Sequence, residues 1–385
     1  MKILYICNEY PPFVHGGIGT FTRDLAEIMH LDGNEVCVWG LYSNLKEKEC
    51  VKINGVKVIR EKGVRYQSKI NSIIYRLQLY YKLRVFLRVH KFDIIECQEY
   101  LGFLPFGLNH KGFIIRLHGA AVFFNHILKR NGSRLTHWYE KQMIKKSQHI
   151  IAVSKYCGES TLKICDLEQK KYKVIYNSVD VKKINVFKSI YKSNYKIVFA
   201  NTVNRKKGVF ELVTAFNKIA SKFPEAKLFI IGKLNYSENG VNIKDLLLDK
   251  VNEKYRSRLF ITGWLNSEQE VYNHLADSHV CVYPSHMEGF GIAPVEPMTL
   301  GKPVLFMKNG PGPEVIEDGV SGLLIDSFSP SDIAEKIELL FLNPNLVNKL
   351  SKNAQLRVKN KFQKDTVFLD NNKKFYDSVL IDFKK

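Results

Sequence analysis

The sequence contains no long apolar run. No stretch reaches the roughly 18 uninterrupted apolar residues that a membrane-spanning helix needs. The chain starts with a short strand-like run at residues 2–7 and shows neither the longer apolar core nor the small-residue cleavage site of a signal peptide. These absences favour a chain that stays in the cytoplasm.

The sequence also lacks any paired cysteine motif. Its seven cysteines are odd in number and stand singly, with no C-x-x-C pair and no cysteine–histidine spacing. Most of them lie inside apolar, strand-like runs. We therefore expect reduced core residues at Cys7, Cys37, Cys50, Cys97, Cys157, Cys165 and Cys281.

Acidic residues are scarce relative to basic ones. Asp and Glu number 38 against 58 Lys and Arg, which gives a formal net charge of +20. This excess favours an anionic partner, such as a phosphorylated small molecule or a phospholipid surface. A second interpretation is compositional, because the chain is rich in Lys, Ile and Asn and lysine then accumulates at the surface. The sequence shows no recognisable nucleic-acid-binding module, so we expect no nucleic-acid partner.

What the sequence does contain is a strand and helix alternation over two domain lengths. A chain of 385 residues suits two domains of roughly 180 residues each. Short runs rich in Val and Ile, typical of buried parallel strands, occupy the first half and start again at residue 195. The expected strands are 2–7, 35–39, 56–59, 93–97, 113–117, 149–153, 173–176, 195–201, 227–231, 258–262 and 280–283. The predicted fold class is α/β, with two Rossmann-like domains.

The most specific local pattern is a glycine loop that opens a helix. Gly289 and Gly291 leave backbone N–H groups open to close approach, and Pro294 suits the first turn of a helix expected over 294–300. The positive N-terminal end of that helix would face the loop. Both features favour a bound phosphate.

Two glutamates flank this loop. Glu288 and Glu296 stand eight positions apart, one before the loop and one in the helix. They can therefore accept hydrogen bonds from hydroxyl groups at two ends of one ligand. A ligand with phosphates in the middle and hydroxyls at both ends is a nucleotide-sugar.

A second glycine cluster follows the first strand. Gly16, Gly17 and Gly19 crowd the start of an apolar helix, so its amides are expected to face the edge of the sheet where strands end. A nicotinamide-binding interpretation requires G-x-G-x-x-G directly after the strand. Here a proline-containing loop intervenes and the third glycine is absent, which disfavours that interpretation.

Together these features resemble the retaining glycosyltransferases of family four, which have the two-domain GT-B architecture. The resemblance covers nearly the whole chain and also includes the segments Gly301-Lys302-Pro303-Val304 and Gly312-Pro313-Glu314-Val315-Ile316. It implies two Rossmann-like domains facing across a cleft. The implied parts are an acceptor-side domain at 1–180, a nucleotide-sugar domain at 181–362, and a C-terminal helix at 363–385 that packs back on the first domain.

The resemblance assigns the donor-binding residues. In the family the first glutamate of the loop contacts the donor sugar and the second contacts the ribose, and these are Glu288 and Glu296 here. Paired glycines corresponding to Gly16 and Gly17 close over the donor phosphates. The amides that hold the sugar and phosphate are those of Phe290, Gly291 and Ile292.

Further residues at strand ends match the family, with one departure. His118 corresponds to a histidine that lines the donor-sugar pocket, and Lys207 corresponds to a lysine that neutralises the donor diphosphate. The family usually also has an arginine five or six residues before this lysine, where Asn201-Thr202 stands here. Arg205 is the nearby arginine, and we expect it to supply that charge from another place on the loop.

The implied reaction is the transfer of a sugar from a UDP- or GDP-sugar to a glycan or lipid-linked acceptor, with retention of configuration. Positioned charge would stabilise the leaving diphosphate, so neither a metal nor a cofactor is expected, and the chain contains no Asp-x-Asp pair. Family members of this size act in bacterial capsule or lipopolysaccharide synthesis. Two alternatives stay open, a nucleotide-sugar 2-epimerase of the same fold and a non-catalytic nucleotide-sugar-binding protein.

Residues 61–92 form a basic segment with interleaved aromatic and aliphatic side chains. Eight Lys and Arg stand there against one acid, Glu61. One interpretation is an amphipathic helix on an anionic bilayer, which would place the protein on the inner face of the cell membrane. The other is an ordinary connecting helix, with its aliphatic stripe on the sheet and its lysines in solvent.

Overall fold

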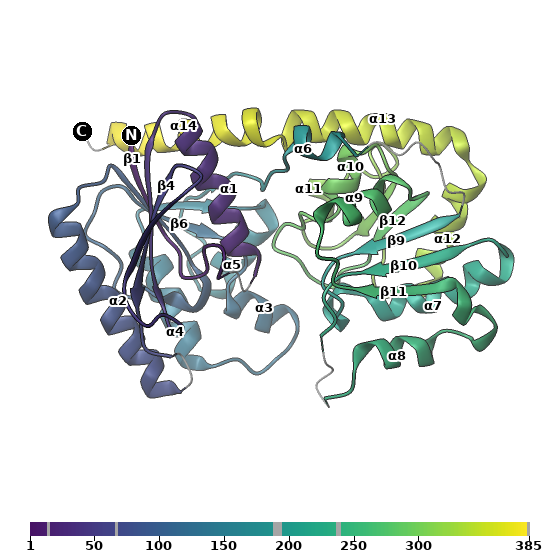
Figure 1. Cartoon of the computed structure of the whole chain (residues 1–385), viewed down its shortest axis with the longest axis horizontal. Coiled ribbons are helices and arrows are strands. Elements are labelled where there is room, and N and C mark those ends of the chain that lie inside the picture. The colour runs from purple at the N-terminus through teal and green to yellow at the C-terminus, as the bar shows by residue number, and fades with distance from the viewer. Residues whose placement is uncertain (14–15, 66–67, 188–194, 236–239, 383–385) are drawn as a thin grey trace. The chain divides into compact units, whose positions relative to one another are not determined.

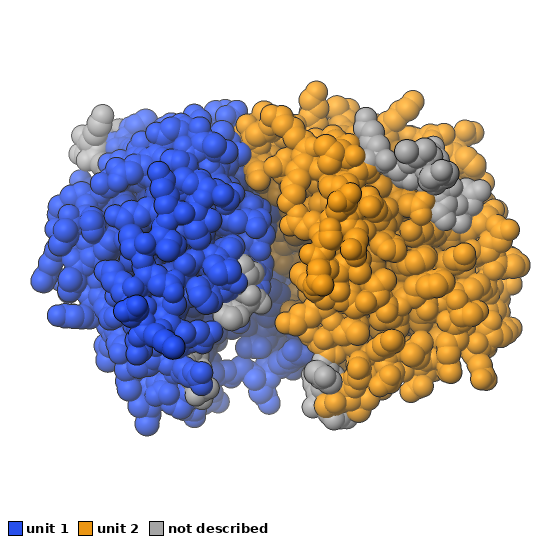
Figure 2. Space-filling view, viewed as in Figure 1, with its two compact units in different colours: residues 1–177, 368–385 blue, residues 178–367 orange. Residues whose placement is uncertain are grey.

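The protein is described by a computed structural model that covers residues 1–13, 16–65, 68–187, 195–235 and 240–382 (Figure 1). The chain divides into two compact units (Figure 2). The first unit is formed by residues 1–177 with 368–385, and the second by residues 178–367. The sequence analysis placed boundaries after residues 180 and 362, and the contacts divide the chain after residues 177 and 367.

The first unit is built on one eight-stranded sheet with the order β3-β4-β2-β1-β5-β6-β7-β8. Its strands are β1 (Lys2–Ile6), β2 (Glu35–Tyr42), β3 (Glu49–Ile53), β4 (Val56–Lys62), β5 (Ile94–Gln98), β6 (Phe113–Leu117), β7 (His149–Ala152) and β8 (Lys173–Val174). Neighbouring strands are parallel except β3, which runs antiparallel to β4. The sequence missed β3 because this edge strand is largely exposed and lacks the apolar run of a buried strand.

The helices of the first unit are α1 (Gly17–Leu31), α2 (Lys69–Val89), α3 (Ala121–Ile127), α4 (Arg134–Lys146), α5 (Lys155–Ile164) and α14 (Leu369–Asp382), with a 3₁₀ turn η1 (Tyr100–Gly102). Across the part of the chain that the structure describes, no helix is both long and apolar enough to cross a bilayer. All seven cysteines carry free thiols, and six are buried, while Cys50 on the exposed strand β3 is not.

The C-terminal helix α14 packs on the sheet of the first unit, as predicted. Tyr376 and Val379 join the core of that sheet. The Arg116 guanidinium donates to Glu96 at 2.7 Å and to Asn372 Oδ1 at 2.6 Å, and the Tyr376 hydroxyl donates to Glu96 Oε2 at 2.7 Å. Removing one member of this fully buried ion pair would leave an uncompensated charge. The network therefore specifies where α14 attaches.

The second unit contains a six-stranded, all-parallel sheet with the order β11-β10-β9-β12-β13-β14. Its strands are β9 (Lys196–Ala200), β10 (Lys227–Ile231), β11 (Leu259–Gly263), β12 (Val280–Tyr283), β13 (Val304–Met307) and β14 (Leu323–Ile325). The α/β class and the two parallel sheets were predicted from the sequence and are confirmed.

Helices cover this second sheet. They are α6 (Val181–Asn185), α7 (Val209–Lys222), α8 (Ile243–Lys250), α9 (Glu268–Ala276), α10 (Val295–Thr299), α11 (Gly312–Val315), α12 (Pro330–Leu342) and α13 (Pro344–Lys361), with the 3₁₀ segments η2 (Arg205–Lys207) and η3 (Glu253–Arg258) and the π-helical segment η4 (Lys364–Phe368) before α14. The apolar face of α7, with Leu212, Phe216 and Ile219, is buried in the core. Each such side chain contributes about 1.5–3 kcal/mol when buried.

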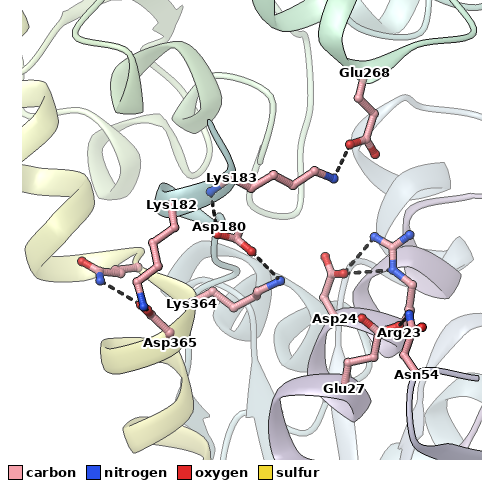
Figure 3. Close-up of polar contacts among 11 residues, drawn as sticks. Arg23, Asp24, Glu27, Asn54, Asp180, Lys182, Lys183, Glu268, Lys364 and Asp365 are labelled. Carbon is pink, nitrogen blue, oxygen red and sulfur yellow. Dashed lines mark hydrogen bonds and ion pairs between the residues drawn. The ribbon is translucent and has the colours of Figure 1, made fainter. Parts of the chain in front are cut away.

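Two distant segments of the second unit run side by side. The Val179 N–H donates to the Phe362 carbonyl at 2.9 Å, and the Lys364 N–H donates to the Val179 carbonyl at 3.1 Å. An ion pair joins Lys182 Nζ to Asp365 Oδ2 at 2.7 Å (Figure 3). Because Lys182 is exposed, solvent screens this pair, and the backbone hydrogen bonds of Val179 contribute more to holding the two segments together.

Candidate active site

A lysine and a glutamate meet at the carboxyl edge of the second sheet, where ligands bind in open α/β sheets. Lys207 Nζ lies 2.5 Å from Glu288 Oε1, and the Ser285 hydroxyl donates to the same oxygen at 2.8 Å. Both charged side chains are mostly buried, with 14% and 12% of their areas exposed. The structure thus brings together two predicted site residues that are far apart in the sequence.

The backbone around Lys207 explains its position. The Asn204 side chain accepts a hydrogen bond from the Lys207 N–H at 3.2 Å and closes the 3₁₀ turn η2. Gly208 then adopts φ 71°, and a Cβ there would lie 1.8 Å from the Pro284 carbonyl oxygen. Only glycine fits this left-handed contact, which holds the Lys207 turn against the strand end that leads to Glu288.

The loop after Glu288 is anchored by aromatic packing. The Phe290 ring is buried and lies 5.6 Å from the Phe362 ring. Gly291 has φ 88°, and a Cβ there would lie 2.6 Å from Phe306 Cζ. The expected helix over 294–300 is shorter, since α10 spans only Val295–Thr299. A helix of this length has a weak dipole, so a phosphate at this loop would be held mainly by the loop amides, and Ile292 there is 37% exposed.

Glu296 lies on α10 in a polar cluster that the sequence did not reveal. Burial, and then the negative charge of Glu268, raise the pKa of Glu296 to about 7, while a hydrogen bond from Tyr272 and the charge of Lys183 act against this rise. Lys183 is ion-paired with Glu268 (Figure 3). The Phe187 ring stacks on Tyr272 at 5.1 Å. The charge on Glu296 is thus coupled to a lysine on α6.

Arg205 belongs to a different set of contacts. Its guanidinium lies over the Phe210 ring at 4.4 Å. His286 Nε2 lies 3.3 Å from Glu211 Oε2. Burial raises the pKa of Glu211, but the His286 hydrogen bond and the Arg205 charge outweigh burial and hold it below its ordinary value. The structure therefore associates Arg205 with Glu211, whereas Lys207 contacts Glu288.

In the first unit, His118 ends strand β6 as predicted. Its ring packs edge-on against Phe21 at 4.5 Å. Burial, and then the positive charge of Arg116, lower the pKa of His118 to about 3. Nε2 of this neutral ring is buried and has no hydrogen-bond partner among the described residues. The low pKa keeps this ring neutral at ordinary pH.

Two buried carboxyl groups hold the loop that carries His118. Glu99 Oε1 accepts from the His118 N–H at 2.7 Å. Glu140 accepts from the N–H groups of Leu101, Ala121 and Val122 at 2.8, 3.0 and 2.8 Å. Burial is the largest cause that raises the pKa values, to about 8 for Glu99 and about 7 for Glu140. Sequence reasoning missed both residues, although Glu99 directly follows a strand and could have been found by the argument used for His118.

The glycine cluster at the start of α1 differs from the expectation of open amides. Gly16 is the N-cap residue and Gly17 begins the helix. The Gly19 N–H, however, donates to Glu9 Oε1 at 2.7 Å. A carboxylate therefore already occupies this helix start, and the expectation that all its amides are open to phosphate is wrong. Glu9 was not identified from the sequence, because no motif links it to Gly19.

A cavity of about 190 Å³ opens next to Glu9 within the first unit. Apolar side chains line most of it, including Ile18, Leu79 and Phe103. Gln98 also lines it, and the buried Oε1 of Gln98 has no hydrogen-bond partner among the described residues. The cavity can hold a largely apolar group with one hydrogen-bond donor.

Comparison with known proteins defines the class of fold. Sucrose-phosphate synthase from Thermosynechococcus elongatus matches with a TM-score of 0.79 at 17% identity, covering 98% of both chains. Anabaena Alr3699/HepE in complex with UDP-glucose matches with a TM-score of 0.69 at 18% identity, covering 98% of this chain and 100% of the other. The protein has the two-domain GT-B fold.

Sequence comparison defines the family. The model described as glycosyl transferases group 1 matches residues 180–357, and that described as glycosyltransferase family 4 matches residues 15–183. The uncharacterized glycosyltransferase MJ1607 of Methanocaldococcus jannaschii is 27% identical over 386 residues, which cover 95% of this chain and 96% of that protein. The Staphylococcus aureus capsular polysaccharide biosynthesis glycosyltransferase CapM is 26% identical over 202 residues, covering 52% and 50%. The chain belongs to the group 1 glycosyltransferases.

Proposed function

We propose that the protein transfers a sugar from a nucleotide-sugar to an acceptor hydroxyl, with retention of configuration and without a metal. The observation that carries this proposal is the contact of Lys207 with Glu288 beside the 289–292 loop. A cation for the diphosphate and a carboxylate for the sugar hydroxyls lie together at the carboxyl edge of the sheet. In the absence of donor each neutralises the other.

The proposed chemistry relies on charge placed where charge develops. The bond between the anomeric carbon and the diphosphate oxygen breaks, and its electron pair leaves with the diphosphate. The acceptor oxygen bonds to the same face of that carbon, and its proton passes to the departing phosphate oxygen. Lys207 and the amides of Phe290, Gly291 and Ile292 stabilise the negative charge on the diphosphate. Glu288, released from Lys207, then accepts hydrogen bonds from the sugar.

The proposed donor is a UDP- or GDP-sugar whose ribose is held by Glu296. HepE, which shares the fold, was solved with UDP-glucose, and this supports a uridine donor. A thermal-shift screen of UDP, GDP, ADP and their sugar conjugates tests the donor site. A ligand at a hundred times its Kd adds about 2.7 kcal/mol of stability. We expect a shift with one nucleotide series, and no shift with any of them would contradict the donor site.

The proposed acceptor is a glycan or lipid-linked molecule at the cytoplasmic face of the membrane. The similarity to CapM supports a role in surface polysaccharide synthesis. The cavity lined by Gln98 offers a place for an acceptor on the first unit. Incubation with donor alone tests the reaction type, because a transferase leaves the donor intact or slowly hydrolyses it. Conversion of the donor to its 2-epimer would contradict transfer.

A further inference from the structure

Helix α2 presents two different faces, and the inner one anchors it to the sheet. Ser72, Tyr75, Leu79 and Leu83 are buried, and the Tyr75 hydroxyl donates to the Leu41 carbonyl at 3.0 Å. These positions follow a helical spacing of three or four residues, so they form one continuous stripe. The inner stripe accounts for the packing of α2, and it leaves the other aliphatic residues of the helix without a partner in the core.

The outer face of α2 is apolar for most of its length. Ile70, Ile74, Leu77 and Tyr81 are 69%, 39%, 55% and 70% exposed. In the view of Figure 1, α2 lies along one side of the first unit with no other element outside it. Solvent-exposed helix faces are normally polar, so an apolar stripe of this kind indicates a surface that binds a partner in the functional state.

The same stripe becomes cationic toward the C-terminal end of the helix. Spaced by three and then four residues from Tyr81, Arg84 and Arg88 extend the line of exposed apolar residues, and both are exposed. They also line a pocket of about 410 Å³ together with Lys91, Tyr80 and Phe92. One helix face therefore carries an apolar part and a cationic part in continuous order.

No acid balances this pocket in the described part of the chain. None of the residues that line it is Asp or Glu, and none of its three cations forms an ion pair. The neighbouring Asp93 accepts from the Lys2 backbone N–H at 2.6 Å. Arg84 and Arg88 stand four residues apart, where like charges destabilise a helix unless an anion lies between them. The pocket has the size and charge for a phosphate group.

The structure also narrows which basic residues can act at a surface. Arg76 is buried and donates to the Gly102 carbonyl at 3.0 Å and to the Ser72 carbonyl at 2.9 Å. Lys82 is ion-paired with Glu61 at 3.3 Å. Of the basic residues in 61–92, Arg76 and Lys82 are thus held by contacts within the first unit, and the available charge lies at the end of the helix.

We infer that the outer face of α2 docks on a bilayer containing anionic phospholipid, with a headgroup phosphate held by Arg84, Arg88 and Lys91. The inference deepens the proposed function, because it places the lipid-linked acceptor and the enzyme at the same surface. From residue 70 to residue 88 the stripe is about 27 Å long, so the helix would lie in the plane of the interface. Charge complementarity selects an anionic bilayer, and the +20 net charge opposes a second copy of the chain.

The test is cosedimentation of the full chain with two kinds of vesicle, phosphatidylcholine alone and phosphatidylcholine with one third phosphatidylglycerol. We expect binding to the anionic vesicles that weakens with added salt. The triple variant Arg84→Gln, Arg88→Gln and Lys91→Gln should weaken it on the order of a hundredfold, since each cation near the surface contributes about fivefold. A control with the same loss of charge, Lys163→Gln, Lys171→Gln and Lys173→Gln, should bind nearly as the parent does.

A second variant tests the apolar part. Ile74→Ser with Leu77→Ser keeps every charge and should weaken vesicle binding at least tenfold, because apolar side chains would no longer enter the interface. Undiminished binding by either α2 variant would overturn the inference. The inference would also be overturned if glycerol phosphate stabilised the parent protein against thermal unfolding but the parent did not bind the vesicles.

The donor thermal-shift screen on the same proteins separates this inference from the proposed function. The α2 substitutions lie in the first unit, so the shift with nucleotide should be unchanged in both variants. Loss of vesicle binding with an intact nucleotide shift supports docking. An intact nucleotide shift with unaltered vesicle binding would overturn the docking site and leave the transferase proposal standing.

Discussion

The two units hold the carboxyl groups near their predicted site residues in opposite ways. In the first unit, Glu99 and Glu140 are fully buried and accept hydrogen bonds from backbone N–H groups. In the second unit, Glu288 keeps part of its surface exposed and contacts the Lys207 ammonium group. Neutral amides bind the carboxyl groups of Glu99 and Glu140. A lysine ammonium group, which can also pair with another anion, binds that of Glu288.

This difference indicates a structural role for the carboxyl groups of the first unit and a role in the proposed reaction for Glu288. A buried amide that loses its carboxyl partner has no other acceptor nearby, so the Glu140 hydrogen bonds are expected to persist as long as the protein is folded. The Lys207–Glu288 pair can open when a ligand supplies a phosphate for the lysine and hydroxyls for the glutamate. The comparison predicts that carboxyl groups of the first unit affect stability most, and those of the second affect turnover most.

The largest expected effect is on Glu288. Glu288→Ala should abolish transfer, a loss on the order of a thousandfold or more, because the sugar loses its orienting carboxylate and Lys207 loses its partner. The unfolding free energy should fall by less than the turnover does, since the side chain packs little apolar area but leaves the mostly buried Lys207 without its partner. Turnover and chemical denaturation measure both quantities. Glu335→Ala, an exposed glutamate of the same unit, is the control, and near-normal turnover in Glu288→Ala would break the comparison.

Lys207 should show the next largest effect. Lys207→Ala should lower kcat on the order of a hundredfold, the loss seen when one transition-state stabiliser is removed. Lys207→Arg should restore part of the rate because it keeps the charge, and the neighbouring Lys206→Ala controls for net charge. If kcat were unchanged in Lys207→Ala, the diphosphate would have to be held by other residues.

The parts that the sequence predicted well are those set by local pattern. Parallel strands appear as apolar runs, and α/β architecture follows from their alternation with helices. Lys207, Glu288 and His118 were each identified separately from motifs. Their environments could not be predicted, because the Lys207–Glu288 contact depends on the Gly208 turn packing against Pro284.

The parts that failed depend on tertiary contacts. Arg76 looks like any surface arginine in a basic segment, and only the fold places backbone carbonyls around it. Glu9 accepts from the Gly19 N–H at the start of α1, and no local sequence pattern indicates this contact. The helix expected over 294–300 is short because the chain turns at Gly301, which has φ 68°. Sequence pattern alone does not report these long-range contacts.

Glu140 tests the structural half of the comparison. Glu140→Ala should lower the unfolding free energy by about 3 kcal/mol, because one buried and two partly buried amides lose their acceptor at roughly 1 kcal/mol each. Glu140→Gln should lose less, since its amide oxygen still accepts. Urea denaturation followed by tryptophan fluorescence measures this loss. A Glu140→Ala protein as stable as the parent would mean that water replaces the carboxylate.

The smallest expected effect concerns the pH dependence of Glu296. With its pKa raised to about 7, this carboxyl group is mostly protonated at pH 6 and mostly charged at pH 8. In the proposed donor site the charged form would accept stronger hydrogen bonds from the ribose, so the donor KM should fall a few-fold as pH rises over this range. Glu296→Gln should remove the pH dependence.

The ion pair beside Glu296 makes this last prediction sharper. Glu268 raises the pKa of Glu296 and Lys183 lowers it, so substitutions at the two positions should move the midpoint in opposite directions. Lys183→Met should move the midpoint of donor KM above 7, and Glu268→Gln should move it below. Equal midpoints in both variants would show that burial alone sets the pKa. Opposite shifts would show that Lys183 on α6 adjusts the pKa of Glu296 and, through it, donor binding. The second unit would then have a carboxyl group whose pKa depends on neighbouring charges, unlike the amide-bound Glu99 and Glu140 of the first unit.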